Sequence, residues 1–399
     1  MNLFSRKENQ SEAGDFAYLQ PNDCYIDVAC QSLRPQCVID AEVDYYQHYN
    51  ACGGRVKHRW GEQVDKKVDQ TRAQLLKYLG KSAGEYEVAF TLNTTYGINM
   101  VLHALPVGEY KRIVTSDIEH NSVLLPTLSV AQCNNLDRIV LSRNDDGSVV
   151  YDFTQLENAI VVLNSISNID GRQCLNINDL ARDVHARGGI LCVDGAQAMV
   201  SQRATLSRLD FDCLFGSSHK MYGPSLGFVI IKKSLLKKCT PALIGGGMVS
   251  DVLKDSYTLI NDDNQLYSRL EPGLQNWAGI MGFSKALEWL SADDRYTPAL
   301  ARAQEVYEGV KQLPGVIMTN ATPSSTFAWY SKSADAHEIA LMYSKSDIMV
   351  RSGYFCCHYY LQHVKNLPPL VRMSFGAHNT KEDVAKILDA TATILTVLR

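Results

Sequence analysis

The chain has 399 residues, of which 46% are hydrophobic and 21% are charged, and its net charge is −4 at pH 7. These fractions are typical of globular proteins and exclude disorder and fibrous repeats. The slightly acidic balance predicts no nucleic-acid partner. No apolar run approaches the ~18 residues that span a bilayer, and the polar first residues lack a signal or transit pattern. The sequence therefore predicts a cytoplasmic protein without a membrane partner.

Eleven cysteines are spread along the chain. They show no C-x-x-C pair and no zinc-like spacing with histidines. We expect reduced thiols, most of them buried as small apolar residues, and no metal site. The adjacent pair Cys356 and Cys357 needs separate treatment.

Short apolar runs alternate with helical patterns through the first two thirds of the chain. The runs lie at 112–116, 138–142, 159–166, 189–195, 212–218 and 226–233, and a helix is predicted at 177–188. Runs that are apolar on both faces indicate a mostly parallel sheet covered by helices.

The pattern changes after about residue 285. We expect helix over 282–313, strands at 325–332, 346–355 and 370–377, and a last helix that Thr380 and Asp383 begin as a capping box. The predicted division is an N-terminal arm (1–24), a large α/β domain (25–285) and a small α+β domain (286–399).

Polar side chains follow four of the predicted strands, where sheets of this kind bind ligands. They are His120, Asn168, Asp194 and the segment 217–220. A lysine is usually a solvated surface charge, but Lys220 lies between an apolar strand and a Gly-Pro turn, which favours a desolvated amine able to form a Schiff base. Asp194 could bind a metal, act as a base or pair with a cation, and a protonated pyridine nitrogen fits its place.

Five motifs carry a family resemblance. They are Ser217-Ser218-His219-Lys220-Met221-Tyr222-Gly223-Pro224, Asp194-Gly195-Ala196-Gln197, Ser167-Asn168 with Gly171, Glu119-His120, and Thr94-Thr95 before a helix. In this order the chain resembles the pyridoxal-phosphate enzymes of the class V aminotransferase group, specifically the cysteine desulfurase and selenocysteine lyase family. The resemblance implies a fold-type I enzyme with a seven-stranded sheet and pyridoxal 5′-phosphate as cofactor.

The resemblance also implies a role for each cofactor residue. Lys220 would form the Schiff base, His120 would stack on the ring, and Asp194 would pair with the ring nitrogen. Asn168 and Gln197 would contact the phenolic oxygen. The phosphate would be held by Thr94, Thr95, Ser217 and His219, at a helix N-terminus whose free N–H groups suit an anion.

A second set of matches lies in the C-terminal third. Arg351, Gly353 and Cys356 match R-x-G-x-x-C, and Arg372 follows. By resemblance Cys356 attacks the substrate sulfur, Arg372 binds the substrate carboxylate, and Arg351 and His58, with Arg55, lie on the substrate side. The alternatives are a buried structural thiol for Cys356 and an exposed loop histidine for His58.

Some positions depart from the family pattern. Tyr354 and Phe355 stand where histidines are common, Cys357 follows the nucleophile, and Leu274 replaces a phosphate-binding threonine. If Cys356 and Cys357 lie on one strand, they point to opposite faces. The motif then selects Cys356 as the thiol that faces the cofactor.

The prediction is a homodimeric cysteine desulfurase. It would convert L-cysteine to L-alanine, leave a persulfide on Cys356 and pass the sulfur to an acceptor protein. Selenocysteine lyase acting on L-selenocysteine, a C–S β-lyase, an epimerase and an aminotransferase use the same fold, because fold and cofactor do not fix the reaction. A cofactor-binding scaffold without turnover is the alternative from another class.

Overall fold

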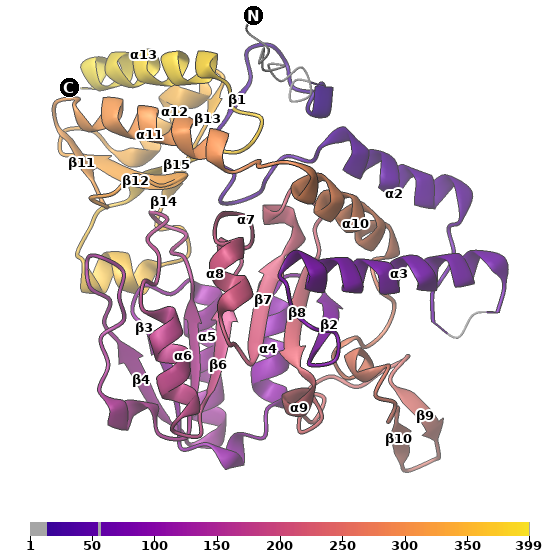
Figure 1. Cartoon of the computed structure of the whole chain (residues 1–399). Helices are drawn as coiled ribbons and strands as arrows, with labels where there is room; N and C mark the ends of the chain where they lie inside the picture. Colours follow the sequence, from indigo (N-terminus) through magenta and orange to yellow (C-terminus); the bar gives the residue numbers. More distant parts are fainter. Residues whose placement is uncertain (1–13, 55–56, 399) are drawn as a thin grey trace, which may run out of the picture.

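The computed structural model describes residues 14–54 and 57–398. Its larger part is built on a seven-stranded sheet in the order β2-β8-β7-β6-β5-β3-β4 (Figure 1). The strands are β2 (Tyr86–Thr91), β3 (Arg112–Ser116), β4 (Asp137–Leu141), β5 (Ala159–Asn164), β6 (Ile190–Asp194), β7 (Cys213–Ser217) and β8 (Gly227–Lys232). All are parallel except β8, which is antiparallel to both neighbours. The mostly parallel seven-stranded sheet is confirmed, and β2 is a strand that the apolar runs did not indicate.

Both faces of this sheet are covered, as alternating strand residues show. Val161 and Leu163 of β5 pack with α2 (Gln36–His48), α3 (Arg59–Tyr78), α6 (Ile177–His185) and α10 (Trp277–Ala292). Ile160 and Val162 of the same strand pack with α4 (Thr94–Ala104) and α5 (Asn121–Asn134) on the other face. Burial on both faces is the reason that the central strands are apolar throughout.

The smaller part lies above the carboxyl ends of these strands in Figure 1. Its antiparallel sheet has the order β11-β12-β15-β14, from β11 (Val316–Met318), β12 (Thr326–Ser331), β14 (Arg351–Gly353) and β15 (Leu370–Ser374). The helices α11 (Thr297–Lys311), α12 (Ala336–Ser344) and α13 (Lys381–Val397) share its apolar core. The capping box at Thr380 is confirmed, with both reciprocal hydrogen bonds present.

The chain enters the structure beside this smaller sheet. Strand β1 (Cys24–Tyr25) pairs in parallel with β13 (Ile348–Met349), and Ile26 continues the ladder by donating its N–H to the carbonyl of Met349. This pairing of segments more than 300 residues apart places residues 27–30 next to Arg351 and Arg372.

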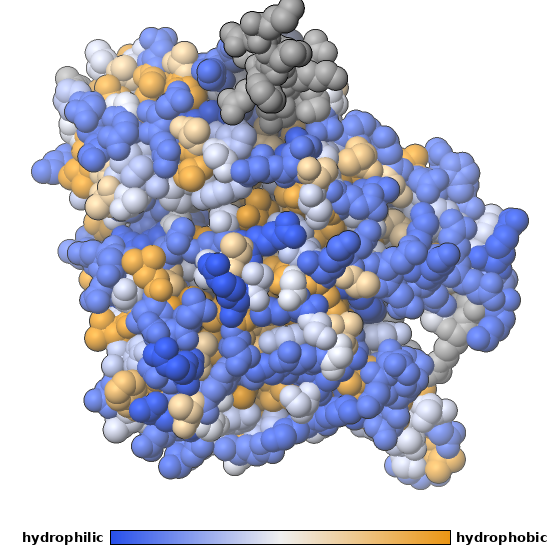
Figure 2. Space-filling model, viewed as in Figure 1, coloured by the Kyte–Doolittle hydropathy of each residue, from blue (hydrophilic) through white to orange (hydrophobic). Residues whose placement is uncertain are grey.

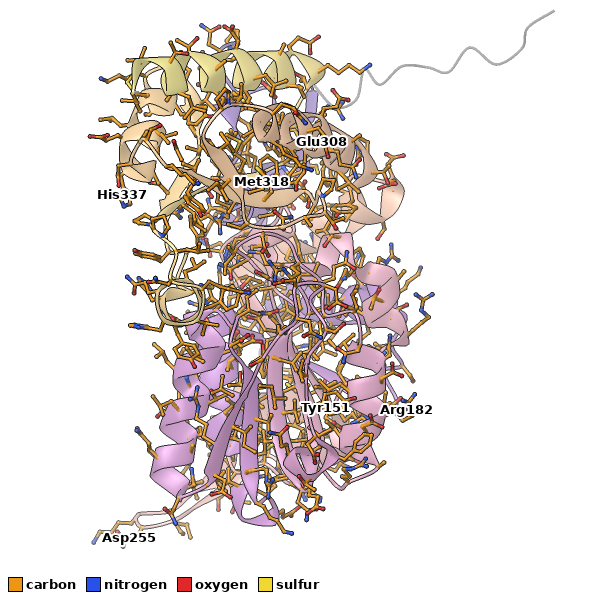
Figure 3. All side chains as sticks on the ribbon, turned by 90° about the vertical axis from the view of Figure 1, so that its left-hand side faces the viewer. Tyr151, Arg182, Asp255, Glu308, Met318 and His337 are labelled. Atoms are coloured by element: carbon orange, nitrogen blue, oxygen red, sulfur yellow. The ribbon has the colours of Figure 1, made fainter. Side chains whose placement is uncertain are left out.

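The remaining α-helices and strands are short. They are α7 (Ala198–Ser201), α8 (Arg203–Arg208), α9 (Lys233–Leu236) and the hairpin of β9 (Val249–Val252) and β10 (Tyr257–Leu259). The hairpin projects from the body of the molecule, and Asp255 in its turn lies at the far tip (Figures 1 and 3).

Two expectations about the smaller part were wrong in detail. The strand predicted at 346–355 ends at Gly353, and Phe355 and Cys356 adopt φ of 49° and 58°, which no strand allows. The helix predicted at 282–313 is two helices, because the chain turns between Ala292 and Thr297. Helix α10 runs through residue 285, and the division of the chain into domains at that point stays a prediction.

Candidate active site

A cavity of about 500 Å³ lies at the carboxyl ends of the parallel strands, where the smaller part meets the sheet. It is lined by every cofactor residue that the motifs predicted: Thr94, Thr95, His120, Asn168, Asp194, Gln197, Ser217, His219 and Lys220. Arg351, Cys356 and Arg372 line it from the smaller part. The structure therefore brings together both groups of predicted residues.

One end of the cavity is rich in hydroxyl groups beside a helix start. Thr94 opens α4, and its N–H and hydroxyl both contact Ser217 Oγ, at 3.2 and 2.5 Å. Thr95 Oγ1 lies 2.6 Å from Ser122 Oγ. A Cβ on Gly227 would lie 2.5 Å from the Cα of Asn93, so glycine permits the close approach that seats this helix start. Hydroxyl groups at the positive end of a helix dipole suit a phosphate.

Ser122 is a member of this end that the motifs did not single out. Its hydroxyl lies 2.8 Å from His120 Nδ1, and its N–H donates to the same nitrogen at 3.0 Å. The sequence signal was present, because Ser122 stands two residues after a histidine that N-caps α5.

The cavity is also lined by a buried acid, Asp194, and by Lys220, whose charges act on each other. Asp194 ends β6, and its Oδ1 accepts the N–H of Ala196 at 2.9 Å. Burial raises the pKa of Asp194, and the positive charge of Lys220 acts in the opposite direction. A buried carboxylate with so few donors suits a cationic ring nitrogen.

Lys220 lies in the short 3-10 turn Ser218–Lys220 that follows β7. Burial lowers its pKa, against the raising effect of Asp194 and with the help of Arg372. Its ammonium group has no hydrogen-bond or ion-pair partner among residues 14–54 and 57–398 and faces the cavity. These properties fit a lysine that reacts as a free amine.

Two histidines line the cavity in the neutral form. Burial, with the nearby charges of Lys220 and Arg372, lowers the pKa of His120 to about 4. Burial also lowers the pKa of His219 to about 4, and Lys220 and Arg34 add to the effect. At neutral pH His120 is therefore an uncharged aromatic ring, which can stack on the ring of a cofactor.

The two predicted amides connect the cavity wall to other segments. Gln197 Nε2 donates to the carbonyl of Ala29 at 2.7 Å. Asn168 Nδ2 donates to the carbonyl of Phe355 at 2.9 Å, and Cys357 Sγ donates to Asn168 Oδ1 at 3.1 Å. Asn168 therefore fixes the loop that carries the adjacent cysteines.

The two cysteines of this loop have different environments. Cys356 is exposed and lines the cavity, and its carbonyl accepts the N–H of Asn121 at 2.7 Å. Cys357 is fully buried, and burial raises its pKa far above the ordinary value. The expectation that only Cys356 faces the cavity agrees with this geometry, but the reason is a left-handed turn at residues 355 and 356 instead of strand alternation.

Two arginines meet at one acid on the substrate side. Arg372 on β15 donates from Nη2 to Asp27 Oδ1 at 2.8 Å and from Nη1 to the carbonyl of Asn168 at 2.9 Å. Arg351 Nε lies 3.3 Å from Asp27 Oδ2, and its Nη2 donates to Cys30 Sγ. The motifs missed Asp27 and Cys30, because only the long-range pairing of β1 with β13 brings them to the site.

His58 and Leu274 do not line the cavity. His58 is an exposed N-cap of α3, where its side chain accepts the N–H of Gly61, and it does not line the cavity. Arg55 lies outside the described residues. Leu274 is exposed and likewise away from the cavity.

No group of three or more His, Cys, Asp or Glu side chains within 14–54 and 57–398 is arranged to hold a metal ion. No helix in those ranges is long and apolar enough to cross a membrane.

The sheet order, and a cavity that contains both a lysine and a buried acid, are typical of fold-type I enzymes. Comparison with known protein families gives the same class. The chain belongs to the aminotransferase class-V family, whose model matches residues 24–387.

Relatives within this family carry a more specific name. The cysteine desulfurase CsdA of Escherichia coli K12 is 28% identical over the whole of both chains. A probable cysteine desulfurase of Pasteurella multocida is 29% identical over 96% of this chain and 92% of its own.

Solved structures give the same result. A crystal structure of E. coli CsdA with an S-sulfonic acid superposes with a TM-score of 0.86 at 27% identity and covers both chains completely. An apo cysteine desulfurase of Thermococcus onnurineus NA1 has a TM-score of 0.83 at 24% identity, over 94% of this chain and 95% of its own, and shares the fold.

Proposed function

We propose that the protein is a pyridoxal 5′-phosphate-dependent cysteine desulfurase that converts L-cysteine to L-alanine and takes the sulfur onto Cys356. The observation that carries the proposal is the shared cavity: Lys220, the buried acid Asp194 and the exposed Cys356 thiol line the same space. Relatives named cysteine desulfurases, full-length in their similarity, support the same reading.

The residues present fit the cofactor. The hydroxyl-rich start of α4 suits its phosphate, and Asp194 suits its ring nitrogen. Neutral His120 offers a flat face to the ring. When bound, pyridoxal 5′-phosphate supplies an electron sink for negative charge that develops at the substrate α-carbon.

The chain's own groups would carry out the remaining steps. Arg372 would orient L-cysteine by its carboxylate, and Lys220 would take the α-proton as an amine. The Cys356 thiolate would attack the substrate sulfur, so that an S–S bond forms as the Cβ–S bond breaks. Protonation of the three-carbon remainder gives L-alanine, and the atoms balance as one cysteine and one thiol against one alanine and one persulfide.

The sulfur must then leave the enzyme. Because Cys356 is exposed on the loop that follows β14, the thiol of an acceptor protein could reach the persulfide. We extend the proposal to an acceptor protein in the cytoplasm that takes up this sulfur.

The exposed apolar residues of the hairpin support a homodimer. Val252 and Leu253 are 63% and 65% exposed, and Leu243, Ile244, Tyr257 and Leu274 on and near the hairpin are also exposed. Figure 2 shows hydrophobic atoms on this projection at the lower right. Apolar side chains on a projecting arm are costly in water, and a second copy of the chain would cover them.

Product analysis tests the proposed reaction. Protein loaded with cofactor should produce L-alanine from L-cysteine, with sulfide after reduction. Pyruvate and ammonia instead would establish β-elimination, and a preference for L-selenocysteine by orders of magnitude would establish a selenocysteine lyase. If no amino acid gives a product, the protein would be a cofactor-binding scaffold without turnover.

A further inference from the structure

A second thiol lines the active-site cavity. Among the cysteines of residues 14–54 and 57–398, Cys30 and Cys356 are the two that line it. Cys30 is half-buried and follows β1 near the start of the chain, whereas Cys356 is exposed on the loop after β14. The ammonium group of Lys220 faces the same space. The cavity therefore holds two thiols and one reactive amine, and the proposed reaction uses one of the thiols.

The backbone on either side of Cys30 fixes its position at the cavity wall. The N–H of Ala29 donates to Ser374 Oγ, on β15, at 2.8 Å. The N–H of Ser32 donates to the carbonyl of His219, in the turn that carries the reactive lysine, at 2.8 Å. Cys30 thus lies on a short segment that is hydrogen-bonded to both parts of the molecule.

Two cationic side chains of the cavity lie near Cys30. Its Sγ accepts a hydrogen bond from Nη2 of Arg351. Lys220 lies within electrostatic reach: burial lowers the pKa of this lysine, and the charges of Asp194 and of a Cys30 thiolate act to raise it. A cation beside a sulfur stabilises its anionic form, and the anionic form is the one that attacks and accepts sulfur.

Cys357, the sequence neighbour of Cys356, has none of these properties. It is fully buried in an apolar cluster with Ile118 and Leu361, and its Sγ donates to Asn168 Oδ1 at 3.1 Å. Burial raises its pKa far above the ordinary value. Cys30, although distant in the sequence, is therefore the thiol that shares a solvent-filled space with Cys356.

We propose that Cys30 is a second sulfur carrier, which takes the sulfur from the Cys356 persulfide inside the cavity. The inference rests on the proposed function, because the desulfurase reaction supplies that persulfide. The Cys30 thiolate attacks the outer sulfur, so that an S–S bond forms on Cys30 as the bond from the outer sulfur to Cys356 Sγ breaks. Cys356 leaves as a thiolate and the proton stays on the transferred sulfur, so the exchange needs no oxidant or reductant. Cys356 can then accept a second sulfur atom.

Counting the sulfur atoms that each protomer accepts tests the proposal. Cofactor-loaded protein is mixed with L-cysteine without reductant or acceptor, quenched early with an alkylating reagent, and analysed for alanine and for sulfur on each cysteine peptide. The wild type should give a burst of about two alanines per protomer, with sulfur on Cys30 and Cys356, whereas Cys30→Ser should give about one. Cys37→Ser changes a half-buried cysteine of α2 that does not line the cavity, and this matched control should behave as the wild type.

A second measurement tests the reach between the two thiols without turnover. Dibromobimane becomes fluorescent when it joins two thiols that lie a few ångströms apart. In cofactor-loaded protein without L-cysteine, the wild type and Cys37→Ser should form a cross-link between Cys30 and Cys356, identified by mass spectrometry. Cys30→Ser and Cys356→Ser should not form it, and circular dichroism checks that each variant is folded.

A wild-type burst of one alanine with sulfur confined to Cys356, or the absence of the Cys30–Cys356 cross-link, would overturn the inference. Sulfur on Cys30 in Cys356→Ser would also overturn it, because the proposed transfer passes through Cys356. The absence of alanine from the wild type would refute the desulfurase reaction itself. A cross-link formed by the same protein would then show that the chemistry failed and not the placement of the thiols, so the two failures are separate results.

Discussion

Burial determines the protonation of the ionisable groups around the cavity. His219 has a pKa near 4 in the folded protein, against about 6.5 for an unperturbed histidine. The unfolded chain binds a proton more strongly at this position, so the stability that His219 contributes is present above pH 6.5 and is lost as the pH falls towards 4. The same sign applies to His120. Buried Glu119, whose pKa is raised to about 7, acts in the opposite direction over pH 4.5 to 7.

We therefore predict that His219→Gln reduces acid destabilisation. Between pH 8 and pH 5 the cofactor-free wild type should lose about 2 kcal/mol more unfolding free energy than the variant, because pH 5 lies about 1.5 units below the pKa of an unfolded histidine and each unit is worth about 1.4 kcal/mol. Urea unfolding at both pH values measures this difference, and Glu119 cancels because both proteins contain it. Parallel losses in the two proteins would show that His219 is not protonated on unfolding in this range.

The sequence predicts the cofactor residues, but it does not predict Asp27, the acid that contacts Arg351 and Arg372. Lys220, Asp194 and His120 each stand at or just after the end of a strand. The few residues around each of them in the sequence are therefore enough to predict the site. Asp27 and Cys30 reach the site only through the pairing of β1 with β13 and β15, and no local pattern encodes a contact over more than 300 residues. His58 is the N-cap of α3 and does not line the cavity. Its role on the substrate side stays a prediction.

At the scale of elements, the loop after β14 decides which thiol is available. Phe355 and Cys356 both take left-handed backbone conformations, which are uncommon outside glycine, asparagine and aspartate. The loop is held by hydrogen bonds from Asn168 to Phe355 and from Asn121 to Cys356. The result is a fixed turn that directs Cys356 to the cavity and Cys357 into the apolar cluster beneath.

The start of helix α13 was predicted from the capping box at Thr380, and the contribution of this box to stability can be measured. Thr380 Oγ1 accepts the N–H of Asp383 at 3.2 Å, and Asp383 returns a bond to the N–H of Thr380 at 2.9 Å. Thr380→Ala should reduce the unfolding free energy by about 1 kcal/mol, because one helix-end donor loses its acceptor. Thr380→Ser keeps the hydroxyl and is expected to lie within a few tenths of a kcal/mol of the wild type. Equal losses in both variants, measured by urea unfolding, would attribute the effect to the lost methyl group.

The sequence predicts the bounds of strands that are buried on both faces. It does not predict the point at which a turn ends a strand. The central strands β3, β5, β6, β7 and β8 fall within the apolar runs of the sequence, because both of their faces are covered. The run at 346–355 looked like one strand, but two left-handed residues end it, and side-chain hydrophobicity carries no signal for such a turn. Strand β2 was missed because a charged residue, Glu87, interrupts its apolar sequence.

At the scale of the whole molecule, the projecting hairpin exposes apolar side chains to water, and a second copy of the chain would cover them. Leu253→Lys adds a charge at an exposed position that makes no part of the chain's own apolar core. We predict that the wild type sediments as a dimer and that Leu253→Lys shifts it towards the monomer without loss of fold. Leu341→Lys, at an equally exposed leucine of α12 away from the hairpin, is the matched control and should remain dimeric. A wild-type monomer at micromolar concentration would contradict the proposed homodimer.

The position of the transferred sulfur tests the central claim most directly. Cofactor-loaded wild type, Cys356→Ser and Cys357→Ser are each mixed with L-cysteine without reductant, and alanine and the sulfur content of the 356–357 peptide are measured by mass spectrometry. We predict that the wild type and Cys357→Ser form alanine and carry one extra sulfur on Cys356, whereas Cys356→Ser, with its cofactor still bound, does neither. Alanine formation by Cys356→Ser at the wild-type rate would contradict the account.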